Sequence, residues 1–336
     1  MDANDRCQRY TPTIHTPETA LKILAPIALS LLALTAAPAS AAYPDKPVTI
    51  IVPYPAGGGT DTVARKLARN FSQRWKTPVI VENVPGAEGL LGSERVLRAP
   101  ADGYTLLFQI SQMMLWKKTM PRARVNAVED FRYISKIQTS PLAFGVSPKL
   151  GVKTLADYVA LCKAGRADCS WGSGSAYAQL IGKQLMDVAG IPNAINIPYK
   201  GTAPMMTDVA GGHIAMAVPA VTSSLGQIQG GLFQLLAVGS DRRSSQVPDT
   251  PTLAEAGYDV HGETWYGLLV AKQTPQPVVD ELSAAVRVAS QDADLLAQIR
   301  HDGGEPVFST PEDFARDVTQ ESQRLESLLE KYWTAP

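Results

Sequence analysis

The chain has 336 residues, of which 45% are hydrophobic, and its formal net charge is −1. This length favours two domains over one, and the hydrophobic content is that of an ordinary globular protein. A nearly neutral chain gives no electrostatic reason to expect binding to nucleic acid or to an anionic membrane surface.

The first 42 residues have the pattern of an export signal. A basic region with Arg6, Arg9 and Lys22 comes first. An apolar stretch from Ile23 to Leu34 follows it, and then the small residues Ala39-Ser40-Ala41. A membrane anchor is the alternative, but the apolar stretch is shorter than the roughly 20 residues that a membrane span needs. We therefore expect residues 1–42 to be a signal peptide that is cleaved after Ala41 or Ala42, and the mature protein to be periplasmic.

The next distinctive stretch is a glycine-rich loop between a strand and a helix. Val48 to Val52 is apolar and β-branched, as in a buried strand, and Gly57, Gly58 and Gly59 follow it. We predict that Thr60 caps the following helix, whose amino-terminal N–H groups then face the loop. This geometry suits an anion, although an ordinary tight connection is the alternative.

The anion expected at this loop is a carboxylate. The pattern of a P-loop is absent from the chain, and Thr62 stands where a dinucleotide-binding fingerprint needs its third glycine. No Lys or Arg lies between Lys46 and Arg65, so neutral dipoles would hold the anion.

Strands and helices alternate along the rest of the chain, which predicts a mostly parallel sheet with helices on both faces. The expected strands are Val79–Val81, Thr105–Phe108, Tyr133–Thr139, Leu142–Val146, Ser170–Gly172, Asn196–Tyr199, Ile214–Val218, Leu235–Val238 and Trp265–Val270. The expected helices are Leu90–Arg98, Thr154–Ala164, one from Tyr177 to Val188, Thr202–Ala210, a short one from Asp249–Thr252 to Ala256, Pro275–Ala289, Leu295–Arg300 and Pro311–Trp333.

Two further polar segments follow predicted strands. Ser173 to Tyr177 repeats the arrangement of strand, Gly/Ser loop and helix, so that two such loops could close on one small ligand. Ser111 and Gln112 follow the third strand, and ligands of open α/β sheets gather at such strand ends.

Cys162 and Cys169 are the cysteines that remain after the signal peptide. They flank a predicted helix end and turn, and we expect a disulfide between them in an oxidising compartment, with two free buried thiols as the alternative. Their spacing, with no histidine nearby, makes a poor metal site. The remaining histidines are also far apart in the sequence, so we expect neither a metal nor a cofactor.

Several segments, in this order, resemble the Bug solute-binding proteins, the extracytoplasmic receptors of tripartite tricarboxylate transporters. They are YPDKPVTIIVPYPAGGGTDTVAR, PVIVENVPGAEGLLG, PADGYTLLF, IPYKGTAPMMTDVAGGHIAMAV, VPDTPTLAEAGY and TPEDF. The resemblance extends from Tyr43 to Trp333.

The resemblance implies a type II periplasmic-binding-protein fold, in which two α/β lobes are joined by crossing strands and the ligand lies between them. Residues 43–141 plus 265–336 would form lobe 1, and residues 142–264 would form lobe 2. It also implies a receptor without catalysis that captures a small carboxylate and delivers it to integral-membrane transporter subunits. A monomer is the default expectation for a receptor that diffuses.

Ligand contacts are expected from four segments. They are Tyr54, Ala56, Gly57, Gly58, Gly59, Thr60 and Asp61; Ser111 and Gln112; Ser173, Gly174, Ser175, Ala176 and Tyr177; and Tyr199, Lys200 and Gly201. The family usually has a histidine where Gln179 stands, so no particular substrate can be carried over.

Some of these residues have a second interpretation. Asp61 either compensates the helix dipole or accepts a hydrogen bond from the ligand. Lys200 either meets a second carboxylate or is a solvated turn residue. Met113, Met114 and Trp116 form either an apolar wall of the site or part of the core.

Two other functions compete with the transport receptor. A receptor that signals to a membrane sensor would have the same sequence features. A secreted serine hydrolase would use Ser173 or Ser175, but the surrounding residues do not match G-x-S-x-G.

Overall fold

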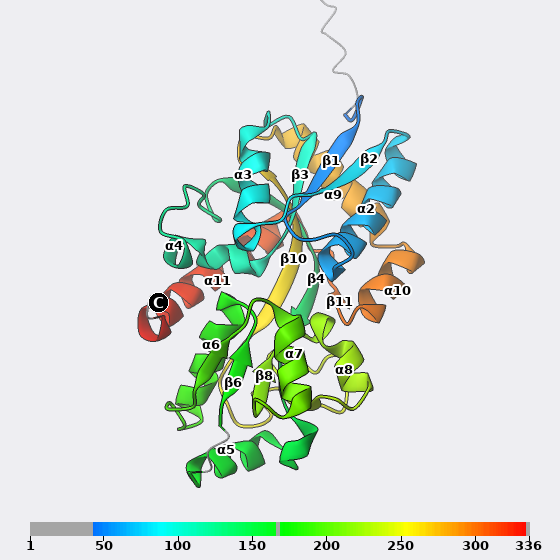
Figure 1. The fold of residues 1–336 in the computed structure, drawn as a ribbon. Coiled ribbons are helices and arrows are strands. Elements are labelled where there is room, and N and C mark those ends of the chain that lie inside the picture. The colour runs from blue at the N-terminus through cyan, green and yellow to red at the C-terminus, as the bar shows by residue number, and fades with distance from the viewer. Residues whose placement is uncertain (1–42, 166–168, 334–336) are drawn as a thin grey trace, which may run out of the picture. The chain divides into compact units, whose positions relative to one another are not determined.

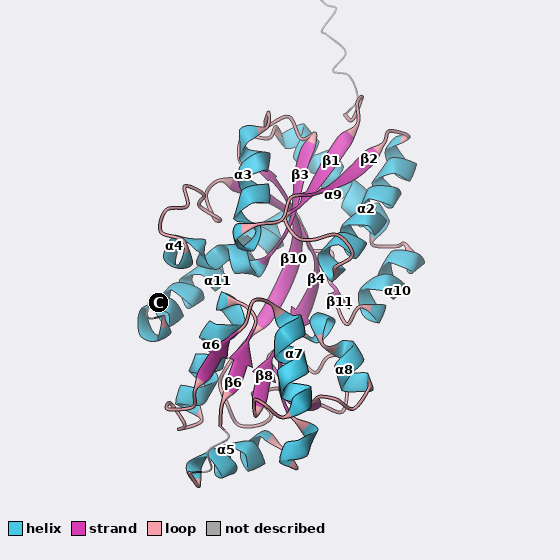
Figure 2. Ribbon diagram, in the orientation of Figure 1, coloured by secondary structure: helices cyan, strands magenta, loops and turns pink. Residues whose placement is uncertain are grey.

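The computed structural model describes residues 43–165 and 169–333, which form two β-sheets covered by helices (Figures 1 and 2). The predicted signal peptide and its cleavage after Ala41 or Ala42 lie outside the described residues.

The first sheet has the strand order β11-β4-β10-β3-β1-β2. Its strands are β1 (Val48–Val52), β2 (Val79–Asn83), β3 (Thr105–Ile110), β4 (Phe131–Pro141), β10 (Glu263–Ala271) and β11 (Glu305–Pro306). Side chains alternate along β1, so Ile50 and Val52 join one buried cluster and Ile51 joins another. Both faces of this sheet are therefore covered, which explains why β1 is apolar at nearly every position.

The second sheet has the strand order β7-β6-β8-β5-β9. Its strands are β5 (Ala143–Val146), β6 (Trp171–Ser173), β7 (Asn196–Pro198), β8 (Met216–Val218) and β9 (Gln234–Val238). β6 pairs in parallel with β7 and β8, whereas β5 pairs antiparallel with β8 and β9.

The chain passes between the sheets at two adjacent places. Leu142 joins β4 to β5, and Gly262 leads back into β10. Leu142 donates its N–H to Gly262 O, Gly262 to Gly239 O and Gly239 to Leu142 O, each at 2.8 Å. A Cβ at Gly239 would lie 2.3 Å from Gly262 O, so only glycine fits here. These paired crossings confirm the predicted fold class, whereas the lobe boundaries stay a prediction.

Helices cover the sheets and connect most of the strands. The α-helices are α2 (Gly59–Trp75), α3 (Leu90–Arg98), α4 (Trp116–Thr119), α5 (Leu155–Lys163), α6 (Ala176–Val188), α7 (Thr202–Gly211), α8 (Leu225–Gln229), α9 (Gln276–Ala289), α10 (Ala293–His301) and α11 (Pro311–Tyr332). Short 3₁₀ helices are η1 (Ala87–Gly89), η2 (Ser111–Leu115), η3 (Pro148–Leu150) and η4 (Val221–Ser223).

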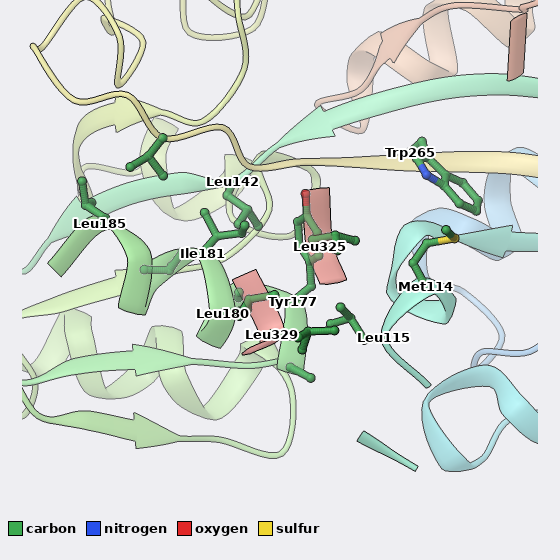
Figure 3. Close-up of a cluster of buried hydrophobic side chains, with 14 of the residues drawn as sticks. Met114, Leu115, Leu142, Tyr177, Leu180, Ile181, Leu185, Trp265, Leu325 and Leu329 are labelled. Carbon is green, nitrogen blue, oxygen red and sulfur yellow. The ribbon is translucent and has the colours of Figure 1, made fainter. Parts of the chain in front are cut away.

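The C-terminal helix α11 contacts elements of both sheets. Near its start, the Phe314 ring meets the Trp265 ring of β10 edge to face, with centroids 5.0 Å apart. Further along, Leu325 and Leu329 share a hydrophobic cluster with Leu180 of α6 (Figure 3). A single apolar core therefore runs from the first sheet, under α11, to the second.

The structure corrects three predictions. The sheets are mixed rather than mostly parallel, because β4 and β10 cross between them in opposite directions. The N-cap of α2 is Gly58, so Thr60 lies inside the first turn. Residues 249–256 form turns instead of a helix, although Thr252 Oγ1 still accepts from the Glu255 N–H at 3.1 Å. The other predicted helices and most predicted strands are present, with ends shifted by a few residues.

Candidate ligand-binding site

A cavity of about 170 Å³ lies where the ends of the two sheets meet the crossing strands. Its lining comes from both sheets: Ile110, Ser111, Gln112, Leu142, Gly174, Ser175, Tyr177, Ala178, Thr202, Val218, Pro219, Ala220, Thr222, Ser223, Thr264 and Tyr266. None of these residues carries a formal charge. The cavity is therefore polar mainly through hydroxyl groups and backbone dipoles.

Ser111 is among the residues that line this cavity, and it has an unsatisfied hydroxyl. It follows the last residue of β3, and its side chain is 0% exposed. Within the described residues, its Oγ has no hydrogen-bond partner. A buried hydroxyl without a partner is costly, so this atom marks a position where a ligand or a water would be stabilised.

The second Gly/Ser loop brings a helix start to the cavity wall. Ser175 is the N-cap of α6, and its Oγ accepts from the Ala178 N–H at 3.1 Å. Gly201, with φ of +97°, is the N-cap of α7 and offers no side chain to its first turn. Thr202, the first residue of α7, lines the cavity. Two positive helix ends thus approach a cavity that has no charged lining.

The crossing strand β10 and the turn η4 form the opposite part of the lining. Tyr266 OH and Thr222 Oγ1 are 3.0 Å apart and share a hydrogen bond. The Thr222 N–H donates to Ser140 Oγ of β4 at 3.2 Å. These contacts fix the side chains of both sheets near their junction. Burial raises the pKa of Tyr266, so its hydroxyl stays protonated.

The first glycine loop is exposed and does not line this cavity. A Cβ added at Gly57 or Gly59 would meet nothing within 4 Å, although the φ of Gly57 is +83°. No side chain caps α2, whose N-cap is Gly58. Ala56 is also exposed and Thr60 is half-buried, so this part of the loop faces open space.

Asp61 holds the first glycine loop in place. Its Oδ2 accepts from the Gly57 N–H and from Arg65 Nε, each at 2.9 Å, and its Oδ1 accepts from Asn83 Nδ2 at 2.9 Å. Burial raises the pKa of Asp61, but these hydrogen bonds, that from Arg65 first, outweigh it and keep the pKa below its usual value. Both carboxylate oxygens are thus engaged within the protein.

Tyr54 fixes the start of the same loop against β3. Its hydroxyl donates to Gln109 Oε1 at 2.6 Å, and Gln109 Nε2 donates to Ser93 Oγ at 3.1 Å. A Cβ at Gly89 would lie 2.8 Å from Gln109 Nε2, so glycine makes room for this network.

The other predicted contact residues occupy varied positions. Ser173 is buried at the end of β6, where its Oγ accepts from Asn196 Nδ2 at 3.1 Å, and Ala176 begins α6 beside the cavity lining. Tyr199 donates to Asp208 Oδ2 at 2.6 Å, and Lys200 is exposed. The structure therefore brings Ser111, Gln112, Gly174, Ser175 and Tyr177 together at the cavity.

The apolar segment after Ser111 belongs to the core. Met113, Met114 and Trp116 are buried in the hydrophobic cluster that continues under α11, and none of them lines the cavity. Of the two interpretations from the sequence, core packing is the one that the structure supports.

The sequence analysis missed the lining residues of β10 and η4. Thr264 and Tyr266 alternate along β10 and therefore share one face of the strand. The sequence spacing predicts that these two residues share a face. Which face meets the cavity depends on how the two sheets cross, and the sequence does not predict that. Thr222 and Ser223 lie in a charge-free stretch that gave no signal for a site.

The predicted disulfide is confirmed: Cys162 and Cys169 are bonded, with Cα atoms 5.5 Å apart. Within residues 43–165 and 169–333, no group of three or more His, Cys, Asp or Glu side chains is placed to hold a metal ion. Over the same described residues, none of the helices is long and apolar enough to cross a membrane.

Comparison with known proteins decides the family. The model of the family described as "Tripartite tricarboxylate transporter family receptor" matches residues 63–333. The chain belongs to this receptor family. Its members are periplasmic solute-binding receptors and not enzymes, so the receptor described here has a solute-binding role, and its family implies a periplasmic location.

The alignments with two similar proteins extend over most of this receptor. It is 32% identical to a UPF0065 protein of Agrobacterium vitis, over 98% of this chain and 99% of the relative. It is also 32% identical to BugT of Bordetella pertussis, over 88% and 92% of the two chains.

Solved structures agree with this family assignment. The periplasmic binding protein BugD has a TM-score of 0.74 and 29% identity, and the match covers 86% of this receptor and 98% of BugD. R. palustris Rpa4515, solved with adipate, has a TM-score of 0.77 and 26% identity, and the match covers 88% and 99% of the two chains.

Proposed function

We propose that this receptor binds a small carboxylate in the cavity between its two sheets and delivers it to the integral-membrane subunits of a tripartite tricarboxylate-type transporter. The observation that carries the proposal is the unpartnered Ser111 hydroxyl beside the starts of α6 and α7. Because no lining residue is charged, the carboxylate is held by hydroxyl groups and helix dipoles. A similar receptor has been solved with the dicarboxylate adipate.

We infer that the first glycine loop contacts the ligand once the two sheets have closed on it. Its exposed backbone and the uncapped start of α2 supply N–H donors that are free for a ligand. Asp61 fixes the loop through the Gly57 N–H, so its contribution to binding is indirect. We expect the sheets to approach each other on binding, which brings this loop to the ligand. Small-angle scattering profiles with and without saturating ligand should therefore differ.

A thermal-shift screen tests the proposed ligand class. The protein is purified from the periplasm and screened against mono-, di- and tricarboxylates, aromatic acids and amino acids, with amines and neutral sugars as controls. A ligand present at ~100 times its Kd adds ~2.7 kcal/mol of stability if it binds only the folded state. One class of carboxylate should raise the melting temperature, whereas a response to amines or neutral sugars alone would contradict the proposal.

A serine variant tests the position of the site. Ser111→Ala should weaken binding of the ligand found in the screen by roughly tenfold, the usual cost of one hydrogen bond to a charged group. Ser327→Ala, on the exposed side of α11, is the matched control and should bind as the wild type does. Equal affinities for all three proteins would move the site elsewhere.

Delivery to a transporter is tested in the cell. Deleting the gene should abolish uptake of the identified ligand, and restoring it should restore uptake. Normal uptake together with a lost transcriptional response to the ligand would instead favour the alternative, a receptor for a membrane signalling protein. We expect the receptor to act as a monomer, which sedimentation of the purified protein checks.

A further inference from the structure

Tyr177 lies between the proposed ligand cavity and a second cavity behind it. Thr264 and Tyr266 of β10 line the first cavity, whereas Glu263 and Trp265 line the second, which measures about 340 Å³. The alternation of side chains along β10 therefore places the two cavities on opposite faces of this strand. Tyr177 lines the first cavity, but its hydroxyl points to groups that line the second.

The Tyr177 hydroxyl has two possible acceptors. It lies 3.1 Å from Glu263 O and 3.5 Å from Glu321 Oε1 on α11. A hydroxyl has a single hydrogen to donate, so only one of the two acceptors receives it at a time. An ionised carboxylate is the stronger acceptor, and a neutral one leaves the hydrogen to the carbonyl.

Helix α11 ties this hydroxyl to the crossing connection that leads into β10. Trp265 Nε1 donates to Glu321 Oε2 at 2.8 Å. Arg324 Nη1 donates to His261 O at 3.1 Å, and its Nη2 donates to Tyr177 OH at 3.4 Å. Glu321 and Arg324 therefore contact α6 of the second sheet, β10 of the first and the segment that joins the sheets. Figure 3 shows Tyr177 beside Leu325 of the same helix.

We propose that Glu321 and Arg324 are positioning residues for Tyr177, so that the ionisation of Glu321 sets the affinity of the ligand cavity. The ionised carboxylate accepts from both Trp265 and Tyr177 and neutralises Arg324. Protonation of Glu321 removes that negative charge, weakens both hydrogen bonds and leaves the guanidinium of Arg324 less compensated. The ionised form thus holds Tyr177 in its place in the cavity wall, and ligand binds this form more tightly.

The surroundings of Glu321 bring this ionisation into the physiological range. Burial raises its pKa to about 7, and Glu263 acts in the same direction, whereas Arg324, the Trp265 hydrogen bond and Lys136 lower it. Charged and titratable groups face the cavity from every element packed around it: Asp317 and Arg324 from α11, Lys136 from β4, Glu263 from β10, Tyr177 from α6, and Asp241 and His261 from the connecting segment. Lys136 pairs with Asp317 at 2.5 Å, and His261 with Asp241 at 2.9 Å.

Ligand affinity as a function of pH is the main test, and it rests on the proposed function. Calorimetry between about pH 5.5 and about pH 8.5 should show roughly fivefold weaker binding by the wild type at the acidic end, a typical coupling between two sites. Ligand carboxyl groups with ordinary pKa values stay ionised over this range. Glu321→Gln should bind with an affinity that is almost independent of pH.

Three variants make this test specific. Glu326→Gln, an exposed residue on the same helix, should keep the pH dependence of the wild type. Tyr177→Phe keeps the ring in the cavity wall but should lose the pH dependence, because the hydroxyl carries the connection. Glu263→Gln should keep the dependence but with a midpoint at lower pH, because the backbone carbonyl of residue 263 meets Tyr177, whereas its side chain only raises the pKa of Glu321. If Glu321→Gln retains the dependence, or Glu263→Gln alone removes it, the proposal is wrong.

A measurement without ligand separates this proposal from the proposed function. The protein is labelled with 5-fluorotryptophan, and the ¹⁹F resonance that moves on Glu321→Gln substitution is assigned to Trp265. In the wild type this resonance should titrate with a midpoint near pH 7, and in Tyr177→Phe it should still titrate. If this resonance titrates but no carboxylate binds in the thermal-shift screen, the proposed function is wrong and the network still stands. A resonance that does not change with pH would overturn the network itself.

Discussion

Gly174 packs directly against Gly201: a Cβ added at Gly174 would lie 2.9 Å from the carbonyl carbon of Gly201 and 3.0 Å from its oxygen. Gly174 precedes the N-cap of α6, and Gly201 is the N-cap of α7. The two helix starts can therefore come this close because residue 174 has no side chain, whereas glycine suits position 201 through its φ of +97°. The sequence repeats a Gly/Ser loop at one of these places and a Lys-Gly turn at the other.

We predict that Gly174→Ala destabilises the receptor and abolishes ligand binding. The new methyl group has only backbone to displace, and overpacking of this kind costs typically 1–3 kcal/mol. Urea unfolding measures the stability, and calorimetry measures the affinity. Gly226→Ala is the matched control, since its Cβ would meet nothing within 4 Å in α8. Equal ligand affinity in Gly174→Ala and the control would contradict the role of this contact.

Asp61→Asn tests whether the first glycine loop must be held in place. The variant retains a carbonyl oxygen but loses the charge that pairs with Arg65, so the Gly57 N–H is bound more weakly. We predict weaker ligand binding with an unchanged fold, measured by calorimetry and circular dichroism. A direct contact between Asp61 and a carboxylate would give the opposite result, because removing the repulsion would tighten binding.

The same residue gives a stability prediction at low pH. The pKa of Asp61 is lower in the folded receptor than its usual value of 3.8, so the folded state binds fewer protons there than the unfolded state does. Its contribution to stability is present above pH 3.8 and is lost as the pH falls through the folded pKa. Asp61→Asn should therefore lose less stability than the wild type on acidification below about pH 4. Parallel acid-induced losses in the two proteins would contradict this.

The sequence predicts those parts of the structure that depend on neighbouring residues, and it does not predict contacts between segments that are far apart along the chain. Buried strands such as Val48–Val52 and capped helices such as Leu155–Lys163 are local patterns, and they were predicted almost to the residue. The partners of Tyr177 could not be predicted, because Glu263 and Glu321 are brought to it by the crossing of the sheets and by α11. Asp61 was recognised as a first-turn carboxylate, but its bond to Asn83 depends on the pairing of β1 with β2.

Removing the disulfide should lower the stability of the folded receptor. Cys162 and Cys169 are 7 residues apart, so their bond closes a short loop in the unfolded chain. The chain-entropy model gives about 2.5 kcal/mol for a loop of this size. The double variant Cys162→Ser/Cys169→Ser should lose about this much in urea unfolding. Adding reductant should lower the stability of the wild type but leave that of the double variant unchanged, whereas an equal response to reductant would exclude the disulfide as the cause.

Glu321→Gln should make the receptor more stable at alkaline pH. In the folded state the pKa of Glu321 is raised from 4.5 to about 7, so between these values the folded receptor binds more protons than the unfolded chain. The stability that protonated Glu321 contributes is complete below pH 4.5 and is lost as the pH rises through about 7. Glutamine keeps an acceptor for Trp265 and carries no charge to be buried, so the variant escapes that loss.

The comparison is made by urea unfolding at two pH values. Near pH 4.5 the wild type and Glu321→Gln should unfold at similar urea concentrations, and at about pH 8 the variant should require more urea. Glu326→Gln should unfold at the same urea concentration as the wild type at both pH values. If the variant is less stable at the higher pH, the ionised carboxylate stabilises this fold instead of costing it stability. The supporting result has two parts: Glu321→Gln is more stable than the wild type only at the higher pH, and its ligand affinity does not change with pH. Together they would show that the same carboxylate lowers the stability of the fold and controls the affinity of the ligand cavity.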